Sequence, residues 1–101
     1  MVSTAYARGR SREYQVLKKL RREGWCCSRS AASHGPVDVF AGKDGRVRMI
    51  QVKSGRSRLK PGDRETLKRW ARAYAGVAEV WYFRKRTGTV IEVIFNARTE
   101  P

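Results

Sequence analysis

Three polar residues in the middle of the chain have the types and the spacing to act on a phosphodiester. Asp38 ends one short apolar segment, and Gln51 and Lys53 alternate on the next. Mg²⁺ accepts carboxylate, amide and peptide oxygens, so Asp38, Gln51 and the Val52 carbonyl are candidate ligands. A metal activates water and neutralises phosphate charge, while a lysine stabilises the transition state or orients the water. The pattern therefore suits metal-dependent phosphodiester hydrolysis, with Gln51 standing where a carboxylate is the ordinary ligand.

A second carboxylate, Glu13, strengthens this interpretation. Glu13 shares a helical face with Leu17 and Leu20, four and seven positions further along. A carboxylate on a core-facing stripe is costly without a partner, so we expect a metal ion or Lys53 to pair with it. Taken singly, Glu13 is an ordinary acid of a first helical turn and the Asp…Gln-x-Lys pattern is a common short match. Together, in so basic a chain, they favour a site.

The elements that must position these residues follow from apolar periodicity and turn signals. Helices are predicted over 11–23 and from Asp63, as the N-cap, to Gly76; strands are predicted over 25–29, 37–41, 47–53, 79–84 and 90–95. Residues 1–10 are predicted to be a mobile basic arm. The Asp-Gly hairpin and strand alternation bring Asp38 toward one face that carries Gln51 and Lys53. The order α-β-β-β-α-β-β indicates a single domain over 1–101, α/β or α+β, with a mixed sheet.

The composition points to a polyanionic partner. The 101 residues include 23 Lys and Arg against 9 Asp and Glu, a net charge of +14, so nucleic acid is favoured over an anionic membrane surface. We expect no membrane span and no signal peptide, hence an intracellular, cytoplasmic protein, in the host cytoplasm if the source is viral. Cys26 and Cys27 are expected to be reduced strand residues, and a single histidine makes a Cys/His zinc site hard to assemble.

Basic side chains close to the candidate site are expected to contact DNA phosphates. They are Arg8 and Arg10 in the arm, Arg29 after the first strand, and Arg56, Arg58 and Lys60 in the loop after Lys53. Ser33, just before Asp38, can hydrogen-bond a phosphate or serve only the turn. The consecutive aromatic residues 81–83 favour a central strand, and a dimer interface that includes Trp70 or Tyr74 stays open.

In order and spacing, several segments resemble the archaeal-type Holliday junction resolvases of the PD-(D/E)xK nuclease superfamily. They are RGRSRE at 8–13, GW at 24–25, RSAAS at 29–33, VDVFAG at 37–42, IQVK at 50–53 and IEV at 91–93. With the second helix, these segments cover nearly the whole chain. The resemblance implies a restriction-endonuclease-like α/β fold, in which helices flank a central mixed five-stranded sheet.

The resemblance also implies an activity. Such a protein is a homodimeric endodeoxyribonuclease that uses Mg²⁺, with Mn²⁺ able to replace it, and resolves four-way DNA junctions by paired symmetric cuts. By position, the metal lies among Glu13, Asp38 and Gln51, the catalytic lysine is Lys53, and Ser33 and Arg29 lie near the scissile phosphate. The departure is Gln51, where these resolvases usually carry glutamate, although a Gln-x-Lys version occurs elsewhere in the superfamily. The metal site is therefore expected to be less anionic than in those resolvases.

Two alternatives stand beside a junction-resolving enzyme. One is another small nuclease of the same superfamily, acting on duplex, nicked or flapped DNA; a comparison of junction and linear duplex cleavage under Mg²⁺ distinguishes it. The other is a non-catalytic basic DNA-binding protein in which Gln51 marks a degraded site. Binding from charge alone would weaken steeply with salt and would not be accompanied by cleavage.

Overall fold

The chain forms two helices and five strands in the part that the structure describes. This computed structural model describes residues 5–30 and 35–100, with side chains from residue 9 onward. The elements are α1 (Ala5–Arg22), β1 (Cys26–Arg29), β2 (Val39–Lys43), β3 (Arg46–Ser54), α2 (Pro61–Ala73), β4 (Val77–Arg84) and β5 (Gly88–Asn96). The predicted order α-β-β-β-α-β-β is confirmed.

The five strands form one mixed sheet in the order β1-β2-β3-β4-β5. Neighbouring pairs are antiparallel except β3 and β4, which are parallel and are joined through α2, as a parallel pair requires. The turn between β2 and β3 places Asp44 at φ 51° and Gly45 at φ 77°. Two consecutive positive φ angles are typical of a type I′ hairpin, so the predicted Asp-Gly hairpin is confirmed.

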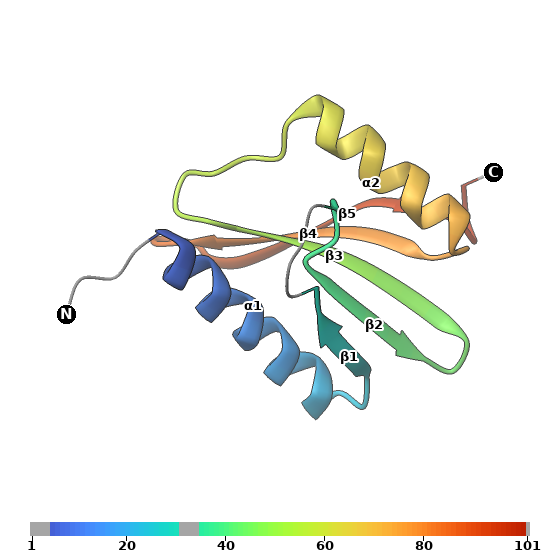
Figure 1. The fold of residues 1–101 in the computed structure, drawn as a ribbon, viewed down its shortest axis with the longest axis horizontal. Helices are drawn as coiled ribbons and strands as arrows, with labels where there is room; N and C mark the ends of the chain where they lie inside the picture. The colour runs from blue at the N-terminus through green and yellow to red at the C-terminus, as the bar shows by residue number, and fades with distance from the viewer. Residues whose placement is uncertain (1–4, 31–34, 101) are drawn as a thin grey trace.

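The helices cover opposite faces of the sheet, with a separate apolar core under each (Figure 1). Val16, Leu17 and Leu20 of α1 are buried against one face, as their spacing predicts. β4 contributes to both cores, because Val80 packs under α2 and Trp81 under α1. The aromatic run therefore belongs to an interior strand, as predicted.

A buried ion pair lies within the α1 layer. Glu79 on β4 is 3% exposed, and its two carboxylate oxygens accept hydrogen bonds from Arg48 at 2.6 and 2.8 Å. The Trp81 indole donates a further bond to Glu79 at 3.0 Å. A buried carboxylate is tolerated only with such partners, so replacing either Arg48 or Glu79 alone should strongly destabilise the fold.

Both helices begin earlier than predicted. α1 starts at Ala5, so the prediction of a mobile arm is wrong for residues 5–10, while residues 1–4 lie outside the described residues. The alanines and arginines of residues 5–10 are good helix formers, and one glycine costs only about 1 kcal/mol. α2 starts at Pro61, with Lys60 as its N-cap, so Asp63 lies in the first turn and is not the cap. Proline at the first position lacks only an N–H that is unpaired there anyway.

Both helices end in the same hydrogen-bonded motif. After α1, Gly24 takes φ 88° and the following N–H of Trp25 donates to the Leu20 carbonyl at 3.0 Å. After α2, Ala75 takes the left-handed position at φ 53°, and Gly76 donates to the Ala71 carbonyl at 2.8 Å. Gly76 is required for another reason, because a Cβ atom there would lie 2.8 Å from the Val47 carbonyl oxygen of β3.

The cysteines are free thiols, as predicted, with Cys26 exposed and Cys27 half-buried on β1. Neither α1 nor α2 is long and apolar enough to cross a membrane.

Candidate active site

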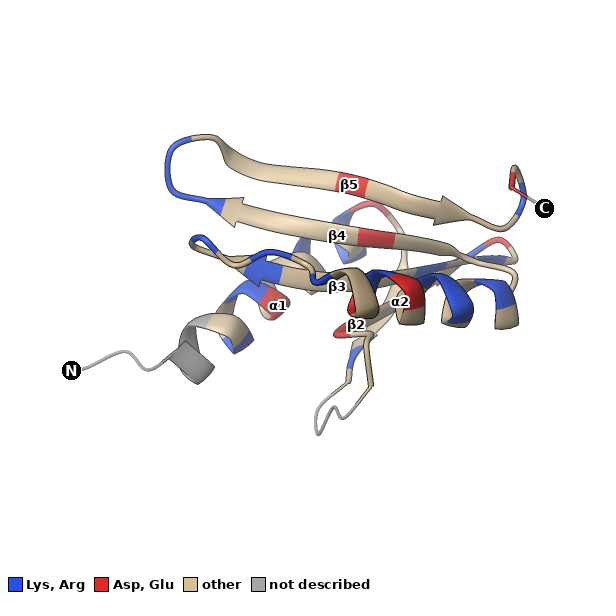
Figure 2. Cartoon of the chain, turned by 90° about the horizontal axis from the view of Figure 1, so that it is seen from above, with Lys and Arg blue, Asp and Glu red and all other residues tan. Residues whose placement is uncertain are grey.

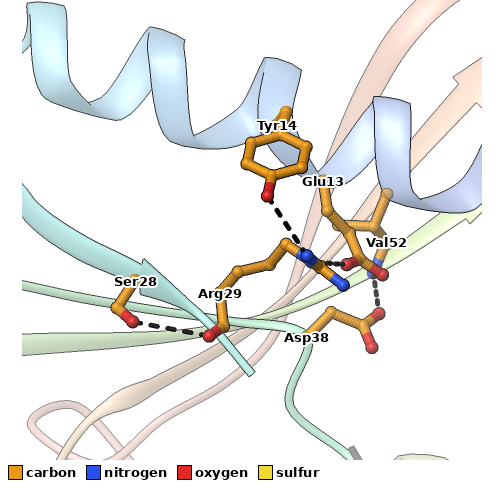
Figure 3. A network of polar contacts seen from close by, with 6 residues as sticks. All are labelled: Glu13, Tyr14, Ser28, Arg29, Asp38 and Val52. Atoms are coloured by element: carbon orange, nitrogen blue, oxygen red, sulfur yellow. Dashed lines mark hydrogen bonds and ion pairs between the residues drawn. The ribbon is translucent and has the colours of Figure 1, made fainter. Parts of the chain in front are cut away.

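A difference in strand length leaves one edge of β3 open. The β2–β3 ladder begins with Val39 opposite Ile50, and the Asp38 N–H donates to the Ile50 carbonyl at 2.9 Å. From there β3 continues to Ser54 without a β2 partner. The Asp38 carboxylate replaces the missing strand, because its Oδ2 accepts the Val52 N–H at 2.8 Å (Figure 3). The N–H and C=O of one strand residue point to the same side, so the Val52 carbonyl lies on this edge as well.

Asp38 is held at this edge in a half-buried position. It precedes β2, rather than lying within the strand predicted over 37–41. Burial raises the pKa of the Asp38 carboxyl to about 6, against the lowering effect of the Val52 N–H; the charge of Glu13 raises it further, and those of Lys53 and Arg29 lower it. These effects place three charged side chains within electrostatic reach of Asp38, as the sequence predicts for Glu13 and Lys53.

Glu13 reaches the same region from α1, but its partner is not the expected one. Arg29, at the end of β1, donates from Nε to Glu13 Oε1 at 2.7 Å (Figure 3). The Arg29 Nη1 donates to the Tyr14 hydroxyl at 3.4 Å, and the guanidinium lies 5.2 Å from the centre of the Tyr14 ring. The bond to Glu13, followed by that to Tyr14, raises the pKa of Arg29. The partner that a core-facing carboxylate needs is therefore Arg29, and not Lys53.

Gln51 and Lys53 share the face of β3 that is turned away from α1. The alternate residues Ile50 and Val52 pack in the α1 core, while Met49 belongs to the core under α2. Among the side chains of residues 9–30 and 35–100, Gln51 Oε1 is the one buried oxygen or nitrogen without a hydrogen-bond partner. An orphaned buried acceptor costs roughly 1–3 kcal/mol, so its presence calls for an explanation.

The oxygen atoms of the predicted site residues are of the kinds that suit a hard divalent cation. They come from the carboxylates of Glu13 and Asp38, the amide of Gln51 and the carbonyl of Val52, which is a ligand set that Mg²⁺ accepts. The orphaned Gln51 oxygen fits this interpretation, since a cation would satisfy it. No group of three His, Cys, Asp or Glu side chains capable of holding a metal occurs in the described part of the chain. The amide in place of a third acid leaves the site less anionic than a three-carboxylate site.

The described basic residues that were predicted to contact DNA lie on α1, at the end of β1 and in the β3–α2 loop. Arg10 is part of α1 and exposed, and Arg29 forms an ion pair with Glu13. The loop between β3 and α2 carries the exposed side chains of Arg56, Arg58 and Lys60 directly after the candidate site. Ser33 and the side chain of Arg8 lie outside the described residues.

The β4–β5 turn is a further basic segment near the end of β3, and it was not among the predicted DNA contacts. The register pairs Ser54 with Phe83, so this turn extends past the end of β3. Arg84 donates to the Gly55 carbonyl at 2.5 Å, which ties the turn to the β3–α2 loop, and Lys85 and Arg86 are exposed. Figure 2 shows both basic segments at the same end of the sheet. The run of three basic residues was visible in the sequence, but its position depends on the parallel register.

Two comparisons with known proteins identify the family and the fold. The model of a family described as archaeal Holliday junction resolvase (Hjc) matches residues 4–99. The structure of Hjc from Archaeoglobus fulgidus, a Holliday junction resolvase from an archaeal hyperthermophile, is similar with a TM-score of 0.75 and 23% sequence identity. That likeness covers 86% of this chain and 73% of the other. It confirms the restriction-endonuclease-like fold with a mixed five-stranded sheet flanked by two helices.

Proposed function

This chain belongs to the archaeal Holliday junction resolvase family, and we propose that it cuts four-way DNA junctions symmetrically, by divalent-metal-dependent hydrolysis in a single domain spanning residues 1–101. Family membership makes it a nuclease and a junction-binding protein. The observation that carries the metal dependence is the buried Gln51 oxygen without a partner, one residue from the Val52 N–H that Asp38 holds. A divalent cation bound at the site would give that oxygen a partner and would account for a polar side chain at this buried position.

Each residue of the edge has a distinct proposed role. Glu13, Asp38, the Gln51 amide and the Val52 carbonyl would hold Mg²⁺, or Mn²⁺ in its place. When bound, the metal supplies charge neutralisation and an activated water. Lys53 is half-buried and interacts electrostatically with Asp38, so it is placed to stabilise negative charge on the phosphate under attack.

Asp38 also acts through the backbone. By accepting the Val52 N–H, its carboxylate fixes the unpaired edge of β3 and hence the direction of the Val52 carbonyl. Ordered donors and acceptors at a reacting centre need no rearrangement during the reaction, which is the main source of electrostatic catalysis. Ser33 is proposed, from the family resemblance, to contact the scissile phosphate.

Basic segments beside this edge are proposed to bind the phosphate backbone. They are the first turns of α1 with Arg8 and Arg10, the β3–α2 loop with Arg56, Arg58 and Lys60, and the β4–β5 turn with Lys85 and Arg86. Their charges have the sign that DNA requires, in a chain with a net charge of +14. Such contacts give an affinity that falls steeply with salt and carries little sequence preference.

A homodimer is proposed because a two-fold junction needs two matched cuts. An aromatic patch on α2 is the surface that suits a second copy. Trp70 and Tyr74 stack with their ring centres 6.2 Å apart, Phe40 meets both rings, and Tyr74 is 53% exposed. A hollow of about 380 Å³ lined by Arg69, Trp70, Ala73 and Tyr74 adjoins the patch. Exposed aromatic anchors beside a hollow are typical of the centres of protein interfaces.

The proposed chemistry is tested by Asp38→Asn. The amide still offers an oxygen to the Val52 N–H but removes the charge that holds the cation, so cleavage should fall by at least about a hundredfold. Binding of junction DNA without metal should change by less than about threefold, because phosphate contacts come from other segments. The matched control is Asp44→Asn in the exposed hairpin turn, which should cleave normally.

Two results would reject the proposal. One is unimpaired cleavage by Asp38→Asn. The other is tight junction binding by the parent protein without cleavage under either Mg²⁺ or Mn²⁺, which would identify a DNA-binding protein with a degraded site.

A further inference from the structure

One of the proposed metal ligands already has a strong partner in the chain. The Glu13 carboxylate accepts a 2.7 Å bond from Arg29, and the two side chains are only 19% and 15% exposed. A charge-assisted bond at this distance is among the stronger protein hydrogen bonds. A cation that takes its place beside Glu13 must therefore compete with the Arg29 guanidinium.

The charges near Asp38 increase the importance of this competition between the metal ion and Arg29. Two carboxylates, Glu13 and Asp38, face two cations, Arg29 and Lys53, so these four groups sum to no net charge. Gln51 adds none, whereas a glutamate at this position would make the sum negative. A dication gains little from a neutral site, so the presence of glutamine makes the position of Arg29 decisive.

We propose that Arg29 exchanges its bond to Glu13 for a DNA phosphate, so that junction binding frees Glu13 and strengthens metal binding. This inference rests on the proposed metal-dependent function. A planar guanidinium suits phosphate as well as carboxylate, and a phosphate that draws Arg29 away from α1 breaks the single bond from its Nε to Glu13. Phosphate also neutralises the Arg29 charge, which leaves the remaining groups net negative. Arg29 is a positioning residue in this account, because it acts on the metal through Glu13.

Tyr14, an exposed residue of α1, gives the Arg29 guanidinium a second contact. Arg29 lies 3.4 Å from the Tyr14 hydroxyl and 5.2 Å from the centre of its ring, and Tyr14 is 54% exposed (Figure 3). An aromatic face holds a guanidinium with little directional demand. Arg29 can therefore turn toward a phosphate without being released into solvent.

Coupling of this kind is reciprocal and measurable. If junction DNA tightens metal binding by some factor, metal must tighten junction binding by the same factor. Phosphate oxygens that themselves reach the metal add coupling that is independent of Arg29. The diagnostic quantity is thus the difference in coupling between the parent and an Arg29 variant.

The experiment measures binding of Mn²⁺ by the electron paramagnetic resonance of free Mn²⁺, with and without a synthetic four-way junction. All proteins carry Lys53→Met, which blocks cleavage in the proposed mechanism. This change makes the site more negative by one charge in every protein alike, so the comparison between variants still isolates Arg29. The test variant is Arg29→Gln. The control is Arg12→Gln, which makes the same charge change beside Glu13 in the chain, although Arg12 contacts Gln15 and Phe83.

We expect junction DNA to tighten Mn²⁺ binding by about tenfold or more in the Lys53→Met parent, within the usual range of coupling. Arg29→Gln should bind Mn²⁺ about tenfold more tightly than the parent without DNA and lose most of the DNA effect. Arg12→Gln should keep the parent's coupling, because it leaves the Arg29–Glu13 bond intact. A general effect of lost positive charge or lost stability would change Arg29→Gln and Arg12→Gln alike, so a difference between them reports on the Arg29–Glu13 bond.

Three outcomes overturn the inference. If Arg29→Gln keeps the parent's coupling and its DNA-free affinity, the exchange does not occur, while the metal site itself stands. If Arg12→Gln behaves like Arg29→Gln, only net charge matters. If no protein binds Mn²⁺ even with the junction, the proposed metal site fails as well. If thermal melting shows that Arg29→Gln does not fold, Arg29→Lys is measured in its place. The coupling should then fall about threefold, because the lysine ammonium lacks the planar, two-donor geometry of a guanidinium.

Discussion

Replacing Gln51 by methionine should make the metal-free protein more stable. Gln51 Oε1 is buried without a partner in the described chain, so the amide contributes an unsatisfied acceptor to the folded state. Methionine has nearly the same length and no branch, and it fills irregular apolar space readily. The substitution removes the polar atom without demanding a new packing arrangement.

The size of the effect follows from the cost of that acceptor. A buried unsatisfied group costs roughly 1–3 kcal/mol, and imperfect packing of the new side chain returns part of it, so a net gain of about 1 kcal/mol is expected. For a domain of this size, 1 kcal/mol raises the melting temperature by roughly 4–8 °C. Cleavage should be lost at the same time, since the amide oxygen no longer serves the metal.

The assay is thermal and urea unfolding of the metal-free protein in the presence of a chelator. Gln15→Met on α1 is the matched control, because it changes the same residue type at an exposed position and should move the midpoint little. Gln51→Glu should do the opposite of Gln51→Met. It places another carboxylate near Asp38, lowers stability without metal, and gains more from added Mg²⁺ because ligand binding stabilises the folded state.

A loss of stability in Gln51→Met of 1 kcal/mol or more would refute this reasoning. It would mean that the Gln51 oxygen is satisfied in solution, and it would remove the observation on which the metal dependence rests. An unchanged Mg²⁺ dependence in Gln51→Glu would place the side chain outside the metal's ligands.

Further predictions concern pH, assembly and backbone geometry. Burial raises the pKa of Asp38 from 3.8 to about 6, so Mn²⁺ affinity should increase as the pH rises through about 6. Over the same rise, from pH 3.8 to about pH 6, the unfolding free energy of the metal-free protein should decrease, because the folded state holds the proton more tightly. Asp38→Asn should lack the stability change. Tyr74→Arg sets two like charges across the proposed two-fold interface and should give monomers by sedimentation velocity, whereas Val93→Arg on exposed β5 should leave dimers. Ala75→Gly should stabilise by about 1 kcal/mol and Gly76→Ala destabilise by about 2 kcal/mol in urea unfolding, and the reverse order would contradict the α2 ending.

Much of the fold is predictable because its signals are local. Apolar spacing identifies the stripe of α1, and Asp44-Gly45 identifies the hairpin that aligns β2 with β3. Once that hairpin is known, alternation along β3 places Gln51 and Lys53 on one face and brings Asp38 to the edge.

The parts that were not predictable depend on pairings between distant segments. Arg29 meets Glu13 only because β1 packs beside α1, and either residue alone has many other partners available in sequence. The Arg48–Glu79 pair requires the parallel register of β3 and β4, which no local motif encodes. The early start of α1 was missed because its first turns include Gly9, which weakens the local helix signal, and lack an apolar stripe of their own.

The most direct test of the central claim is cleavage of a synthetic four-way junction compared with a linear duplex of the same sequence, under Mg²⁺ and at matched protein concentration. Paired, symmetric cuts are expected in the junction, with little or no cutting of the duplex. Equal cutting of both substrates, or junction binding without any cut, would contradict it.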